Sequence, residues 1–284
     1  IIISTSNQLS IMDKFIKVQM LGSDPEFLIK NQKSNKYISS IGIIPGTKEE
    51  PHKIEELGKG YAIEIDNVLG EFNIPPASTK EEFVANMNKM KLFIDKWLKS
   101  KDENLVAVHL ASARYDEDQL QSEEAKLFGC DPDFCAWTRS QNEKPKAKDT
   151  RLRSTGCHIH VSFEDKDIDK CEVLVKAMDL FLGVPSILMD KDKDRRQLYG
   201  KAGCFRIQQY GVEYRTLSGF FLGSDELIGW MFDNTMAAIE WINSDLSSAR
   251  IALEENREEI ISAINNGDEE KASSLVQKFG IKLV

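Results

Sequence analysis

The 284-residue sequence lacks several features on which common functional sites depend. Its five cysteines are odd in number and include no CxxC pair. This argues against a disulfide scaffold or a zinc ribbon, and a reducing cytoplasm is the expected setting. The sequence also contains neither a GxxxxGKS/T loop nor a GxGxxG turn. A P-loop enzyme and a dinucleotide-binding fold are therefore excluded.

An excess of basic charge and a long apolar segment are also missing. The net charge of -9 argues against general nucleic-acid binding, which requires a basic surface. No apolar run approaches the roughly 20 residues of a membrane span, so no membrane partner is predicted. The first residues have neither the basic region nor the apolar core of a signal peptide. We expect residues 1–12 to be an N-terminal extension or remnant and residues 13–284 to form a single domain.

Two of the four histidines lie in one alternating segment, residues 154–163. Its apolar residues share one face of a predicted strand: Cys157, Ile159, Val161 and Phe163. His158 and His160 share the other face, with their side chains about 7 Å apart. Taken alone, this pattern is equally typical of a strand with a solvated polar face.

Acidic residues alternate with apolar ones in two further predicted strands. Asp24 and Glu26 share a face, and Pro25 between them suggests an edge strand or a bulge. Glu64 shares a face with Asp66, whereas Glu71, seven residues later, would point the opposite way in an unbroken strand. A turn or bulge within residues 67–70 would return Glu71 to the same face.

Helices are predicted at two places. Residues 79–100 begin with a capping box and carry a Met and aromatic stripe typical of a core-facing helix. Ser224 can cap a C-terminal helical part that extends to residue 284, either as a dimer surface or as a backing for the sheet. Between them, residues 105–113 resemble a buried strand in which His109 is a satisfied core histidine. Residues 138–155 read as a polar loop, either a lid or a plain solvated loop.

The polar strand faces together supply a set of acids and histidines with arginines close in sequence. Its members are Asp24, Glu26, Glu64, Asp66, Glu71, His158, His160 and Glu213, with Arg195, Arg206 and Arg215. Several carboxylates on one sheet face are costly unless cations neutralise them. Oxygen-rich ligands with an imidazole suit Mg²⁺ or Mn²⁺ better than zinc, and nearby arginines suit a transferring phosphoryl group. The set predicts a phosphate-handling site on an antiparallel sheet.

Five motifs in a fixed order resemble the carboxylate–amine ligases of the glutamate–cysteine ligase and glutamine synthetase superfamily, in particular the phage-type amidoligases. They span residues 22–27, 64–75, 155–161, 199–206 and 211–215. The resemblance implies an α+β fold, with a curved antiparallel sheet as the floor of the active site and helices on its outer face. It also implies ATP and Mg²⁺ or Mn²⁺ as cofactors, and amide formation through an acyl phosphate. The implied substrates are a carboxylate and an amine, such as amino acids, peptides or polyamines.

The resemblance also implies roles for the residues in the motifs. Asp24, His158 and Glu213 would hold one metal against the ATP phosphates. Glu26, Glu64 and Glu71 would hold a second metal near the acceptor carboxylate. Arg206 and Arg215 would contact phosphates, with Arg195 as a helper, and His160 would bind nucleotide or orient a ligand. Asp24 stands where the family usually has Glu, so its carboxylate reaches about one methylene less.

Two other functions use the same residues. A metal-dependent hydrolase or nuclease would turn over without ATP. A catalytically inactive binding protein on a ligase-like fold would retain its function after changes at Glu71 or His158. The complete set of acids and arginines favours the ligase.

Overall fold

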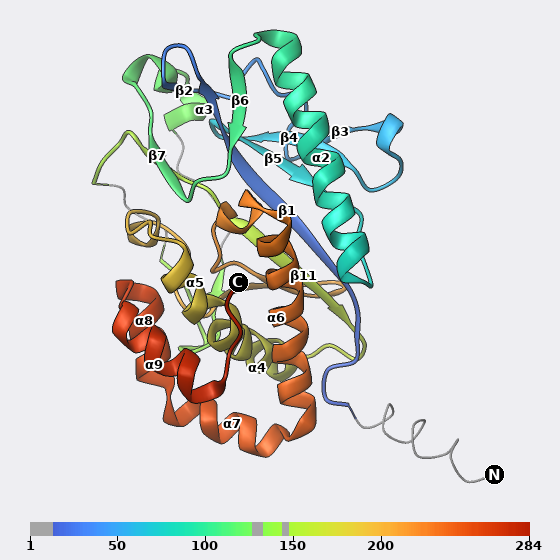
Figure 1. Cartoon of the computed structure of the whole chain (residues 1–284), viewed down its shortest axis with the longest axis vertical. Helices are drawn as coiled ribbons and strands as arrows, with labels where there is room; N and C mark the ends of the chain where they lie inside the picture. Colours follow the sequence, from blue (N-terminus) through green and yellow to red (C-terminus); the bar gives the residue numbers. More distant parts are fainter. Residues whose placement is uncertain (1–13, 127–132, 144–147) are drawn as a thin grey trace, which may run out of the picture.

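The computed structural model in Figure 1 describes residues 14–126, 133–143 and 148–284. The predicted extension at residues 1–12 lies outside these ranges. The described chain is a mixed α+β structure with a large antiparallel sheet, which confirms the predicted class at this level. None of the described helices combines the length and the apolar character that crossing a membrane requires.

The large sheet has a central path of strands in the order β3-β4-β5-β1-β11-β13-β12-β8-β9, and β2 and β6 also pair with β1. The strands of this sheet are β1 (Val18–Asn31), β2 (Lys36–Ile38), β3 (His52–Lys53), β4 (Ala62–Asp66), β5 (Leu69–Asn73), β6 (Leu105–Val108), β8 (Phe134–Cys135), β9 (Ser140–Gln141), β11 (Cys157–Phe163), β12 (Cys204–Gln208) and β13 (Gly211–Tyr214). A separate two-stranded sheet pairs β7 (Ser112–Arg114) with β10 (Leu152–Ser154). The 14-residue β1 is the long diagonal strand of Figure 1, and it joins the two halves of the large sheet.

The helices are α2 (Lys80–Lys101), α3 (Glu123–Lys126), α4 (Ile168–Met178), α5 (Val184–Met189), α6 (Asp225–Ser244), α7 (Leu246–Glu255), α8 (Arg257–Asn266) and α9 (Glu269–Phe279). Short 3-10 turns cover Glu55–Leu57, Glu117–Leu120, Arg195–Gln197 and Gly219–Gly223. A π-helical turn, Asp179–Gly183, connects α4 to α5. Helices α4 to α9 gather in one half of the molecule, and α4 packs against β12 and β13 (Figure 1).

The apolar faces predicted from the sequence form the core. All four apolar residues of the histidine strand β11 are buried: Cys157, Ile159, Val161 and Phe163. Helix α2 buries the predicted stripe at Phe83, Met87, Met90, Ile94 and Leu98. Thr79 caps α2 as predicted, because its Oγ1 accepts a hydrogen bond from the Glu82 amide, while the side chain of Glu82 accepts from the Ser78 amide instead of the Thr79 amide of a capping box. Ser224 caps α6 in the same way.

The structure corrects several local predictions. Pro25 is not on an edge strand: β1 lies between β5 and β11, and the pairing with β5 includes only Glu26 and Phe27, where no proline amide is needed. Residues 105–113 contain the whole of β6 and the start of β7, with His109 between the two strands. His109 is not a satisfied core histidine, because its Nδ1 has no hydrogen-bond partner among the described residues.

Candidate active site

Antiparallel register brings the predicted polar residues together on one face of the sheet. Residues that pair directly across antiparallel strands point to the same face. The pairs run across six neighbouring strands: Glu64 with Glu71, Glu71 with Glu26, Asp24 with His158, His160 with Glu213, and Glu213 with Arg206. Residues two apart on a strand also share a face, so Asp24 and Glu26, and His158 and His160, join these pairs into one surface.

Glu71 reaches this face through a turn, as the sequence predicted. Strands β4 and β5 form a hairpin whose last pair is Asp66 with Leu69. Asn67 in the turn has a φ of 59°, a left-handed conformation that asparagine tolerates better than most residues. The reversal therefore places Glu71 directly opposite Glu64.

The first half of the face is centred on Asp24. Its Oδ1 lies 3.1 Å from His158 Nδ1 and 3.2 Å from His160 Nε2. Glu213 Oε1 is 3.4 Å from the same nitrogen of His158. The other ring nitrogen of His160 lies 2.7 Å from the Tyr210 hydroxyl, and the two rings stack. Asp24, His160 and Glu213 each offer an atom within 4.8 Å of the others, which is close enough to share a cation.

Two arginines border this half. Arg215 is buried, pairs with Glu213, and lies 3.2 Å from His158 Nδ1 and 3.4 Å from Asp133 Oδ2. Arg206, on the neighbouring strand, has Nη1 3.6 Å from Glu213 Oε1. The predicted pair of arginines is thus beside the acids that it was expected to accompany.

The second half of the face contains only carboxylates as candidate ligands. Glu26, Asp66 and Glu71 offer oxygen atoms within 4.8 Å of one another. Glu64 lies directly opposite Glu71, and its Oε2 is buried with no hydrogen-bond partner among the described residues. One oxygen of Glu26 accepts a hydrogen bond of 2.6 Å from the Gly156 amide. The side chain of Lys48 lies over this group, with Nζ 2.9 Å from Asp66 Oδ1.

The two halves have opposite electrostatics. In the first, burial opposes ionisation of Asp24, but the two histidines lower its pKa below the usual range. In the second, burial raises the pKa of Glu26 to about 8 and that of Glu64 to about 7, and it raises the pKa of Glu71 well above its usual value. Without an added cation, the all-carboxylate half therefore retains protons at neutral pH.

The pKa values of the two histidines shift in opposite directions. Burial, with Arg215, lowers the pKa of His158, which favours the neutral imidazole that a metal requires. Burial acts in the same direction on His160, but Asp24 outweighs it and raises the pKa of His160. His158 is therefore the better candidate for a neutral ligand, and His160 for a cationic partner of a phosphate.

The environment of Arg195 differs from the one that a phosphate-contacting role requires. Its guanidinium is 2% exposed and donates to the backbone carbonyls of Thr155, Thr216 and Leu217 at 2.6 to 2.8 Å. These bonds tie the start of the histidine strand to the segment after β13. The predicted phosphate contact is not supported, because the donors that it needs already serve main-chain acceptors.

The donor set fits the magnesium ions that the resemblance implies. Oxygen atoms predominate, one half also offers imidazole nitrogen, and the buried Glu64 Oε2 has no partner within the described chain. The groups that lie close enough to share a cation differ from the implied ligand sets at one residue each. His160 takes the place of His158 beside Asp24 and Glu213, and Asp66 takes the place of Glu64 beside Glu26 and Glu71. His158 and Glu64 nevertheless lie directly beside these groups.

Several site residues are absent from the motif-based set. Asp66 shares its face with Glu64 by simple alternation, so the sequence pattern contained that signal. Lys48, Tyr210 and Asp133 come from turns and loops, and no periodicity marks them as neighbours of the acidic face.

Comparison with known families supports the resemblance. Residues 148–279 match the family model of the phage phiEco32-like COOH.NH2 ligase-type 2. This segment contains His158, His160, Arg206, Glu213 and Arg215. The match covers less than half of the chain, and the matched family is the one that the sequence motifs resemble.

No curated protein matches the sequence. Among solved structures, the chain is similar to a bifunctional glutathione synthetase from Pasteurella multocida, with 11% sequence identity and a TM-score of 0.43. The alignment covers 96% of this chain and 50% of that one, so the chain spans about half the length of the synthetase.

Proposed function

We propose that the protein is an ATP- and Mg²⁺-dependent carboxylate–amine ligase that forms an amide bond through an acyl phosphate. Its substrates would be a carboxylate and an amine drawn from amino acids, peptides and polyamines. The observation that carries the proposal is the continuous face from Glu64 to Arg206, on which two acidic groups lie side by side and arginines border one of them.

The half around Asp24 would receive the triphosphate. Asp24, Glu213 and the neutral imidazole of His158 would hold one cation, while Arg206 and Arg215 neutralise the negative charge that develops on the phosphoryl group. Glu213 and Asp133 hold the guanidinium of Arg215 in place, so little reorganisation is needed when the phosphate arrives.

The half around Glu71 would receive the acceptor carboxylate. Glu26, Glu71 and Glu64 or Asp66 would hold a second cation, so that two negatively charged substrates can approach each other. Bound Mg²⁺ supplies Lewis-acid stabilisation of the crowded oxygens. The carboxylate attacks the γ-phosphorus and displaces ADP, and the amine then attacks the acyl carbon and displaces phosphate. No covalent link to a protein side chain is required.

The test is ADP release by the purified chain with ATP and Mg²⁺, against pools of amino acids, polyamines and short peptides. We expect ADP only when a carboxylate and an amine are both present, and no ADP from Glu71→Gln. A matched control is Glu269→Gln, because Glu269 is the first residue of α9 and pairs with Lys191 instead of a residue of the acidic face. Turnover without nucleotide would instead indicate a hydrolase, and the absence of ATP binding in calorimetry would contradict the ligase proposal.

A further inference from the structure

Lys48 lies at the tip of a rigid turn above the all-carboxylate half of the site. The amide of Glu50 donates to the carbonyl and to the Oγ1 of Thr47, and the amide of Thr47 donates back to the Glu50 carbonyl. The Gly46 carbonyl accepts from the amide of Ile65 on β4. The turn is thus closed on itself and attached to the strand that carries Glu64 and Asp66.

The attachment depends on the glycine. Gly46 has a φ of +84°, and a Cβ there would lie 2.5 Å from the His52 nitrogen and 2.6 Å from the Ile63 oxygen. A side chain at this position would push the turn away from β4. The local sequence therefore holds the lysine over the acids with little freedom in its backbone.

The ammonium of Lys48 provides the closest positive charge to these acids in the ion pairs of the described chain. Its Nζ lies 2.9 Å from Asp66 Oδ1, and it also interacts electrostatically with Glu71 and Glu26. One ammonium is not enough for four neighbouring acidic groups. Glu64, which is 5% exposed, still has Oε2 buried without a hydrogen-bond partner among the described residues. These four acidic side chains therefore need more positive charge than Lys48 alone supplies.

We propose that Lys48 is the built-in counter-ion of the group Glu26–Asp66–Glu71, and that a divalent cation displaces it from Asp66 on binding. The inference rests on the proposed function and adds a residue that determines cation specificity. Exchange of the ammonium for Na⁺ or K⁺ adds no net charge, whereas exchange for Mg²⁺ adds one positive charge. Lys48 thereby weakens the binding of every cation but disfavours monovalent ions the most.

The test measures Mn²⁺ binding to the full chain by electron paramagnetic resonance, without nucleotide and without turnover. Lys48→Met is expected to bind Mn²⁺ roughly two- to fivefold more tightly than the unaltered chain, since a partly exposed competing charge has been removed. Lys48→Arg keeps the charge and should retain the original affinity. In Lys48→Met, replacing tetramethylammonium chloride by NaCl at equal ionic strength should weaken Mn²⁺ binding, because Na⁺ can now enter the group.

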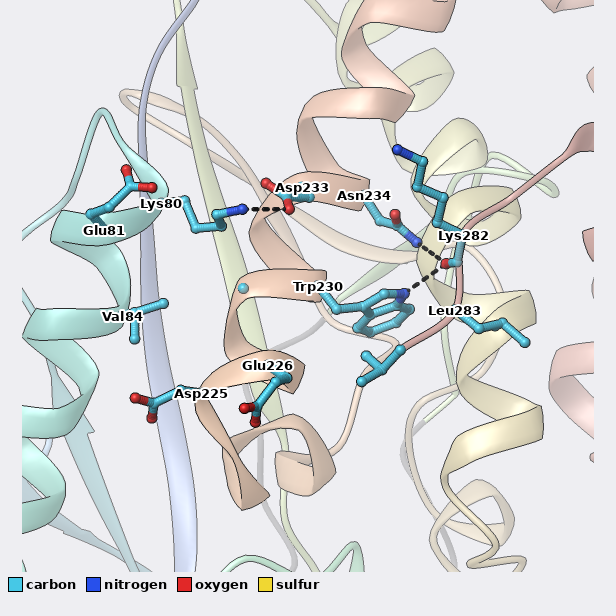
Figure 2. A pocket seen from close by; sticks show the side chains of 12 residues that line it. Lys80, Glu81, Val84, Asp225, Glu226, Trp230, Asp233, Asn234, Lys282 and Leu283 are labelled. Carbon is cyan, nitrogen blue, oxygen red and sulfur yellow. Dashed lines mark hydrogen bonds and ion pairs between the residues drawn. The ribbon is translucent and has the colours of Figure 1, made fainter.

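Lys80 offers a matched control. Its Nζ lies 2.9 Å from Asp233, and its side chain is 41% exposed, against 47% for Lys48. Figure 2 shows this pair in a pocket between α2, α6 and the last residues of the chain, which contains none of the predicted site residues. Lys80→Met removes an equivalent ion pair and should leave Mn²⁺ affinity unchanged.

A second readout needs no variant at Lys48. Amine-selective acetylation of the unaltered chain, followed by peptide mass spectrometry, should label Lys48 faster when Mn²⁺ is present, while labelling of Lys80 stays constant. Equal Mn²⁺ affinity in Lys48→Met and the unaltered chain, or labelling of Lys48 that does not respond to Mn²⁺, would overturn this inference alone. Absence of Mn²⁺ binding in every variant would overturn the metal dependence of the proposed function and this inference with it.

Discussion

The substitution Gly70→Ala tests whether the spacing between β1 and β5 positions Glu26 and Glu71. Gly70 pairs across the strands with Phe27, and it lies next to Glu71, just as Phe27 lies next to Glu26. Its φ is not in the left-handed region, so an alanine would not strain the backbone. A Cβ would, however, lie 2.2 Å from Phe27 Cζ and 2.5 Å from Cε1. The only obstacle to Gly70→Ala is therefore steric.

The clash is large compared with what the site can absorb. Ordinary contact begins at 3.4 Å, so the ring or the strand has to move by more than 1 Å. Phe27 is fully buried and packs against Phe72, which leaves its ring no open space. Overpacking of this kind costs about 1 to 3 kcal/mol, and the lower entropy of the unfolded alanine chain offsets about 0.4 to 1 kcal/mol. The middle values of the two ranges leave a net loss of about 1.3 kcal/mol, which lowers Tm by roughly 3 to 5 °C in a large domain.

Thermal unfolding and Mn²⁺ binding measure the two consequences separately. If β5 moves, Glu71 leaves its place opposite Glu26, and Mn²⁺ affinity should fall by about tenfold. Gly223→Ala is the control, because its Cβ would meet only Leu227 Cδ1 at 3.7 Å. Adding Phe27→Leu to Gly70→Ala should restore part of both properties. An unchanged Tm in Gly70→Ala would refute the reasoning, since no other packing constraint is invoked.

Two further predictions concern the corrected arginine and the protons of the acidic face. Arg195→Met should lower the free energy of unfolding by about 3 to 5 kcal/mol in urea titrations, because several buried carbonyls lose their donor. The ATP affinity of the folded fraction should stay unchanged. A fall in ATP affinity would instead support the phosphate-binding role. For the metal-free protein, burial raises the pKa of Glu26 to about 8 and that of Glu64 to about 7, so the folded state binds protons that the unfolded state has already lost above its ordinary carboxyl pKa. The Tm in EDTA should therefore fall as pH rises from 6.5 to 8.5, and Glu26→Gln should flatten this profile. Mg²⁺ should restore more stability at pH 8.5 than at pH 6.5. The lowered pKa of His158 acts in the opposite direction, so a Tm that rises over this range would contradict the dominance of the two acids.

Side-chain alternation predicted which residues share a face, but not which strands are neighbours. The period of two placed His158 and His160 opposite the buried residues of β11, and the expected turn returned Glu71 to the face of Glu64. The pairing of Asp24 with His158 joins residues more than a hundred positions apart, and no local pattern encodes it. The composition of the combined polar faces suggested a shared site, but it did not say which strand lies beside which.

The side chains that the sequence misjudged are those whose role depends on their partners. The resemblance implied a helper role for Arg195 beside the phosphates, yet its guanidinium donates to main-chain carbonyls. The sequence analysis assigned no role to Lys48, although its turn holds it against Asp66. Pro25 suggested an edge, but a central strand tolerates proline where the neighbouring ladder does not need its amide. In each case the partner comes from a distant part of the fold.

Two buried carboxylates on opposite faces of the large sheet, Asp179 and Glu64, differ in the number of hydrogen-bond donors that the protein supplies to them. Asp179, in the π-helical turn behind the sheet, is fully buried, yet its carboxylate accepts from four donors: Trp137 Nε1, the Gly203 amide, the Tyr214 hydroxyl and Thr216 Oγ1. These bonds hold β13 from behind and favour the charged form of Asp179, although burial outweighs them and raises its pKa to about 7. Tyr214 lies between Glu213 and Arg215, so fixing it also fixes the backbone that presents those two residues to the opposite face. On that face Glu64 keeps a buried oxygen without a partner among the described residues, and Lys48 is the nearby counter-charge. Four protein donors serve one buried acid, whereas the other has a buried oxygen without a partner among the described residues, which is the arrangement that the proposed cation site requires.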